Sequence, residues 1–239
     1  MVQNMVLADS SNHENLKPHD PNSKGNDCYY IIISFRNAEA YCKGDISASF
    51  DRLVSLFTKD PIHCDLIPSV YRNGCSSEPI TRKYYTSYMT EKFSKNDLTQ
   101  SLISRDENYH DMALPISESE FTSICDLLQG WVEQGVTYNY GDLPLAAGLL
   151  GNGRITRTLF PDTCNPKTPG KLFCSQAVIL CLRHCLKDKR HDARKNDLLE
   201  ILAKTNCRSV SPRKLMKILQ PFCHWIKRSS LDKDSIVFD

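Results

Sequence analysis

Several absences limit what this chain can do. Its 239 residues carry no strong excess of either charge, because 30 basic and 28 acidic residues leave a formal net charge of +2. Nucleic-acid-binding proteins normally show a clear basic excess, so nucleic acid is not an expected partner. No apolar run approaches the roughly 20 residues that cross a bilayer, and the first residues lack the basic and apolar regions of a signal peptide. We therefore expect a soluble protein of the cytoplasm without a transmembrane segment.

The cysteines indicate a reducing compartment. There are eleven of them, and an odd number cannot close into a complete set of disulfides. No pair has the Cys-x-x-Cys spacing of a zinc site, and neighbours on a helix such as His184 and Cys185 face different directions. We expect reduced thiols, no metal and no cofactor, although soft and imidazole ligands are present at Cys185, His184, Cys207, Cys223 and His224.

The chain divides into a polar tail and one domain. Residues 1–27 are polar, show no periodicity and are predicted to be disordered. Hydrophobic residues make up 41% of the chain and charged residues 24%, which suffices for a core without metals or disulfides. Residues 28–239 are therefore predicted to form a single domain.

Short apolar or β-branched segments predict the strands. A buried strand is expected at 29–35, a hairpin from the segments 63–71 and 80–89, and a further strand at 109–114. Residues 91–108 are predicted to be a polar excursion.

Apolar periodicity predicts the helices. Ser117 and Glu120 have the spacing of a capping box in front of an amphipathic run. Residues 173–186 are apolar nearly all round and should form the central buried helix. Three further helices are expected at 50–57, at 193–204 and after Ser211-Pro212, the last two closing the chain.

Cys174 is the strongest candidate for chemistry. It falls in the first turn of the predicted buried helix, where unpaired backbone N–H groups and the helix dipole favour a thiolate. The same amides, with that of Ser175, can stabilise an oxyanion. The alternative is that Cys174 is one more buried cysteine of the core.

A thiolate needs a base, and His63 is the best placed of the seven histidines. It opens a predicted strand whose alternation puts His63 and Asp65 on one face. A carboxylate there can fix the tautomer of the imidazole. On spacing alone, a surface histidine of a strand is the commoner interpretation.

Two motifs resemble the circularly permuted NlpC-like papain-fold superfamily, found in bacteria and large DNA viruses. The segment His63-Cys64-Asp65-Leu66-Ile67 resembles its "H-x-E/D-apolar" strand, and Phe173-Cys174-Ser175-Gln176-Ala177-Val178 resembles its "F-C-S-E-L-V" helix. The histidine strand also precedes the cysteine helix, as in permuted members.

The resemblance implies an α+β, papain-like fold, with a small antiparallel sheet packed against the helix that carries the nucleophile. Cys174 would then be the nucleophile, His63 the base and Asp65 the orienting residue. Tyr138 and Tyr140 would line the cleft or donate to the oxyanion, or else anchor a loop. Asp65 stands where many relatives have Glu, so Ser87 or another polar residue is an alternative orienting group.

The function implied is that of a thiol hydrolase acting on peptide or amide bonds through a thioester, that is, a cysteine peptidase or amidase. A lipid-directed acyltransferase or thioesterase is one alternative, and a non-catalytic binding module, such as a viral structural protein, is another. Viral relatives imply action in a host cytoplasm or a virion. The expected partner is a peptide, amide or acyl-lipid substrate.

Overall fold

The apolar run of three isoleucines forms the middle of the sheet. Ile31, Ile32 and Ile33 are fully buried on β1 (Asp27–Arg36), which has a strand on each side. β1 pairs antiparallel with β2 (His63–Arg72) and with β5 (Tyr109–Ile116). Such a strand, buried on both faces, needs apolar residues without alternation, as the sequence has.

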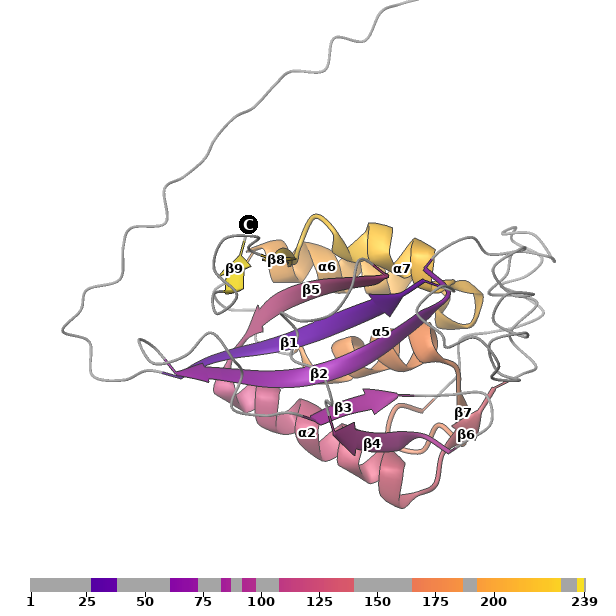
Figure 1. The fold of residues 1–239 in the computed structure, drawn as a ribbon. Coiled ribbons are helices and arrows are strands. Elements are labelled where there is room, and N and C mark those ends of the chain that lie inside the picture. Colours follow the sequence, from indigo (N-terminus) through magenta and orange to yellow (C-terminus); the bar gives the residue numbers. More distant parts are fainter. Residues whose placement is uncertain are drawn as a thin grey trace, which may run out of the picture.

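The structure is a computed structural model that describes residues 27–37, 61–72, 83–86, 92–97, 108–139, 165–186, 193–228 and 236–238. Its main sheet has seven strands in the order β4-β3-β2-β1-β5-β8-β9 (Figure 1), and all its pairings are antiparallel. A separate parallel pair joins β6 to β7. The remaining strands are β3 (Lys83–Thr86), β4 (Ser94–Asp97), β6 (Thr137–Tyr138), β7 (Lys171–Leu172), β8 (His224–Arg228) and β9 (Ile236–Phe238).

The described helices begin where the sequence predicts. In α2 (Glu118–Glu133), the Ser117 hydroxyl accepts from the Glu120 N–H, and the Glu120 carboxylate accepts from the Ser117 N–H at 2.8 Å. The predicted capping box is thus confirmed. The others are α5 (Cys174–Cys185), α6 (Ala193–Lys204), α7 (Pro212–Leu219) and a short 3₁₀ turn at Cys207–Ser209.

One face of the sheet meets the helices. Ile31, Ile33, Leu66 and other residues of that face join side chains from α2, α5, α6 and α7 in a single core cluster. The other face carries a smaller cluster of Ile32, Ile67, Tyr71 and Ala113. Every residue of α5 from Cys174 to Leu182 is buried. The predicted central helix is confirmed, and so is the α+β class.

Two expectations were wrong. The predicted polar excursion contains β4, which among the described strands pairs only with β3. Its residues Ser94–Asp97 are polar, so no apolar alternation predicts this strand. The chain also continues past α7 into β8 and β9, although the sequence predicts that two helices close the chain. Pairing with β5 overrides local preference there.

Some expectations fall outside the described residues. These are the helix at 50–57 and residues 1–26 of the predicted tail. Asp27, the last residue of that tail, begins β1. Among the described residues, no helix combines the length and apolar content of a membrane span.

Candidate active site

The ends of four elements meet at one edge of the fold. β1 ends at Arg36, which lies opposite His63, the first residue of β2. β3 ends at Thr86, and α5 begins at Cys174. Antiparallel pairing places the end of one strand beside the start of the next, which brings these residues together.

The His63 imidazole is held from one side. Its Nε2 lies 2.9 Å from Asp65 Oδ1 and 2.9 Å from Thr86 Oγ1. The Thr86 hydroxyl also donates to the Asp65 carboxylate. We therefore assign the Nε2–H to Asp65, an assignment that rests on the network of partners. This leaves Nδ1 as the nitrogen that can meet the thiol of Cys174.

Asp65 is buried and ionised. Arg36 Nη2 lies 3.0 Å from Asp65 Oδ2, and the carboxylate is only 3% exposed. Burial by itself would raise the pKa of Asp65, but the charge of Arg36 and the hydrogen bonds from His63 and Thr86 outweigh it. The pKa of this carboxyl is held well below its usual range.

His63 is correspondingly easy to protonate. Burial and the charge of Arg36 lower the pKa of His63. The negative charges of Asp65 and Cys174 outweigh both and raise that pKa to about 9. At neutral pH the imidazole is therefore a cation with a proton to give.

Cys174 carries the opposite perturbation. The Cys64 thiol has the largest effect, because it donates a hydrogen bond to the Cys174 sulfur. Burial acts in the other direction, and the charge and hydrogen bond of His63, with a backbone hydrogen bond from Cys64, add to the lowering. The pKa of Cys174 lies well below that of an ordinary thiol. Together, the two shifts favour a thiolate on Cys174 and an imidazolium on His63.

The structure brings Cys174, His63 and Asp65 together, and it pairs Tyr138 of β6 with Leu172, two residues before Cys174. The Ser175 hydroxyl turns away and donates to the Val210 carbonyl at 2.5 Å, so only its backbone N–H remains a candidate for an oxyanion. Tyr138 is buried in the main core cluster on β6, which suits a loop anchor. Tyr140 and Ser87 lie outside the described residues.

Three residues of the site were not predicted. Thr86 directly precedes Ser87, the alternative orienting group considered above. Arg36 reaches Asp65 only because of the β1–β2 register. Cys64 lies in the core cluster, as strand alternation predicts, but its contact with Cys174 depends on how α5 packs against β2. No local sequence signal marks any of the three.

Removing the Asp65 carboxylate should destabilise the protein strongly. Asp65→Ala leaves the positive charges of Arg36 and His63 without their buried partner, which costs about 3–5 kcal/mol of unfolding free energy. Urea unfolding of both proteins at pH 7 measures the difference. Because the folded pKa of Asp65 is depressed, its contribution is present above the unfolded value of about 3.9 and is lost as the pH falls further. The difference in unfolding free energy between the unsubstituted protein and Asp65→Ala should therefore become smaller in acid.

An exposed ion pair supplies the control for this variant. Glu200 pairs with Lys204 on the surface of α6, where both side chains are well exposed. Glu200→Ala should change the urea midpoint very little. If Asp65→Ala and Glu200→Ala lowered the urea midpoint equally, the buried Asp65 carboxylate would contribute no more to stability than the exposed one of Glu200.

No family model, curated protein or solved structure matches the chain. Within the described ranges, no group of three or more His, Cys, Asp or Glu side chains is arranged so that it could hold a metal ion. We therefore infer the function from the chemistry of the site itself.

Proposed function

We propose that the chain is a thiol hydrolase that cleaves peptide or amide bonds through an acyl-enzyme on Cys174, with His63 as its acid and base. The contact between the Cys174 sulfur and the His63 imidazole, at the first turn of α5, is the observation that carries the proposal. The circularly permuted papain-like fold, with its histidine strand ahead of its cysteine helix, is part of the same proposal.

Each residue has a step in this mechanism. The Cys174 thiolate attacks the carbonyl carbon, and backbone N–H groups at the start of α5 receive the oxyanion. The His63 imidazolium gives its proton to the leaving amine, which leaves a thioester on Cys174. His63, now neutral, takes a proton from water, which attacks the thioester and releases the acid. Asp65 holds the imidazole orientation throughout.

A second candidate is transfer of a lipid acyl group. A cavity of about 310 Å³ lies between α2 and β2–β4, and its lining is mainly apolar. Tyr85, one of its walls, adjoins Thr86, which contacts His63. Such a cavity suits an acyl chain better than a polar peptide. The lining residues are Pro68, Tyr85, Lys95, Phe121, Cys125, Asp126 and Gln129.

Acylation by p-nitrophenyl acetate tests the proposal without knowledge of the natural substrate. Cys174 is only 3% exposed, so a small acyl donor is the appropriate probe. We expect a burst of one p-nitrophenolate per chain at pH 7, with the acetyl group found by peptide mass spectrometry on Cys174. Cys223 is the internal control, because burial raises its pKa to about 12 and it should stay unmodified.

Other outcomes separate the alternatives. Acetylation spread over several cysteines, or none at all, would contradict the thiol hydrolase and favour a non-catalytic binding module. Faster acylation by p-nitrophenyl decanoate than by the acetate would favour lipid acyl transfer over peptide hydrolysis.

A further inference from the structure

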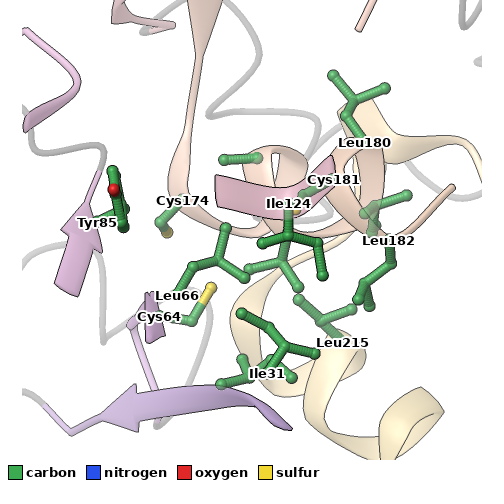
Figure 2. Packing of buried hydrophobic residues seen from close by; sticks show 14 of the residues in the cluster. Ile31, Cys64, Leu66, Tyr85, Ile124, Cys174, Leu180, Cys181, Leu182 and Leu215 are labelled. Carbon is green, nitrogen blue, oxygen red and sulfur yellow. The ribbon is translucent and has the colours of Figure 1, made fainter. Parts of the chain in front are cut away.

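The contact between Cys64 and Cys174 brings together two thiols from distant parts of the chain. Cys64 is the second residue of β2 and Cys174 the first of α5, and the Cys64 thiol donates a hydrogen bond to the Cys174 sulfur. Figure 2 shows the two side chains near each other, with Leu66 beside Cys64. They are 1% and 3% exposed. Peptide hydrolysis needs no second thiol at this place.

The two thiols differ in charge. Burial, together with the hydrogen bond to Cys174, raises the pKa of Cys64 well above its ordinary range, so Cys64 stays protonated. Cys174 is the thiolate. A thiolate reacts with hydroperoxides and a neutral thiol does not, so oxidation should begin at Cys174. The sulfenic acid formed there would already have a thiol within contact distance.

We propose that Cys174 and Cys64 form a hydroperoxide-sensitive pair that closes into a reversible disulfide. The Cys174 sulfur attacks the outer oxygen of a hydroperoxide, the O–O bond breaks, and the alkoxide takes the His63 proton and leaves as an alcohol, or as water from hydrogen peroxide. The Cys64 sulfur then attacks the Cys174 sulfur, and hydroxide leaves with the Cys64 proton as water. Two thiols and one hydroperoxide thus give a disulfide, one alcohol and one water. A dithiol reverses the step by thiol–disulfide exchange.

The chain contains a comparison pair for this chemistry. Cys181 and Cys185 also touch through a hydrogen bond and are buried in α5, but His63 does not act on the pKa of Cys181. That pKa is raised well above its ordinary value, so the Cys181 thiol stays protonated at neutral pH. The Cys64–Cys174 pair, in which the pKa of Cys174 is lowered, should therefore oxidise faster than the Cys181–Cys185 pair.

The test uses the full, reduced chain and equimolar hydrogen peroxide at pH 7. Free thiols are blocked with N-ethylmaleimide under denaturing conditions at set times, and peptides are mapped with and without reduction. We expect the peptides of Cys64 and Cys174 to be joined while those of Cys181 and Cys185 remain alkylated. Oxidation of both pairs at one rate, or of neither, would overturn the proposal.

Substitution of Cys64 identifies its part in the reaction. In Cys64→Ala, Cys174 loses the hydrogen bond that lowers its pKa most, so its oxidation should be slower than in the unsubstituted chain. The oxidised Cys174 should nevertheless be trapped by dimedone as a sulfenic acid and then pass to the sulfinic acid. The unsubstituted chain should give little dimedone adduct. Sulfinic acid on Cys174 at the same rate in both proteins would show that Cys64 does not intercept the intermediate, and this comparison does not depend on acyl transfer.

Loss of acyl transfer on oxidation, with recovery in dithiothreitol, is the consequence that rests on the proposed function. Disulfide formation in a chain that never accepts an acetyl group would contradict the thiol hydrolase and support the oxidation site. A normal acylation burst without a disulfide would support the hydrolase and contradict the oxidation site.

Discussion

Serine in place of Cys174 is expected to lower the acylation rate by p-nitrophenyl acetate at least about 10⁴-fold, since nucleophile replacements have effects of this order or larger. The contacts of this position stabilise a thiolate: the Cys64 thiol, the Cys64 backbone and the His63 cation all surround the sulfur. A serine hydroxyl ionises far less readily and stays neutral among them. The measurement is the second-order rate of p-nitrophenolate release at pH 7.

Cys181→Ser is the matched control for this loss. Cys181 lies in the same helix and is equally buried, but its pKa is raised and it does not contact His63. It should retain the acylation rate, even if the hydroxyl in the core lowers the thermal midpoint. Circular dichroism of both variants checks that α5 is intact. A residual burst in Cys174→Ser, or an equal loss in Cys181→Ser, would remove Cys174 from the proposed chemistry.

The local part of this fold could be predicted from the sequence because it depends on local signals. The capping box at Ser117 and Glu120 fixes the start of α2, and Ser211 with Pro212 fixes the start of α7. The apolar run in β1 and the nearly continuous burial of α5 follow directly from composition. Each of these signals lies within one element, where the period of apolar residues decides the structure.

The sheet order could not be predicted in the same way. β1 lies between β2 and β5, and β8 returns to pair with β5 after α7. These pairings join residues far apart in the chain, and no short segment encodes them. β4 illustrates the difference, since this polar strand is held by β3, its one neighbour among the described strands, and by the buried Phe93 that precedes it.

The candidate site likewise contains residues that local motifs predict and residues whose roles depend on contacts between distant elements. Cys174, His63 and Asp65 could be proposed because each stands in a short motif at the start of an element. Arg36 and Cys64 could not, because their roles depend on the register between β1 and β2 and on the packing of α5. Those two residues set much of the electrostatics: Arg36 keeps Asp65 ionised, and Cys64 favours the thiolate.

Alanine in place of His63 is expected to lower the turnover of an amide substrate about 10²–10⁴-fold at pH 7. This is the range found for general acid–base groups. In the unsubstituted protein, turnover should be high once Cys174 is ionised and should fall as the pH passes about 9, where His63 loses the proton it gives to the leaving group. In His63→Ala that falling limb should vanish. His110→Ala is the control, since His110 is a partly buried histidine of β5 whose side chain pairs with Asn37.

Alkylation by iodoacetamide distinguishes the two roles of His63, because this reaction needs a thiolate but no proton donor. The strongest influence on the Cys174 thiolate is Cys64, which His63→Ala leaves in place. Alkylation of Cys174 should therefore fall much less than turnover does, and its pH midpoint should rise because the imidazolium charge is gone. If alkylation and turnover fell by the same factor, His63 would serve only to ionise the thiol. If neither changed, the imidazole would be a structural partner of Asp65, and Cys174 would lack its base.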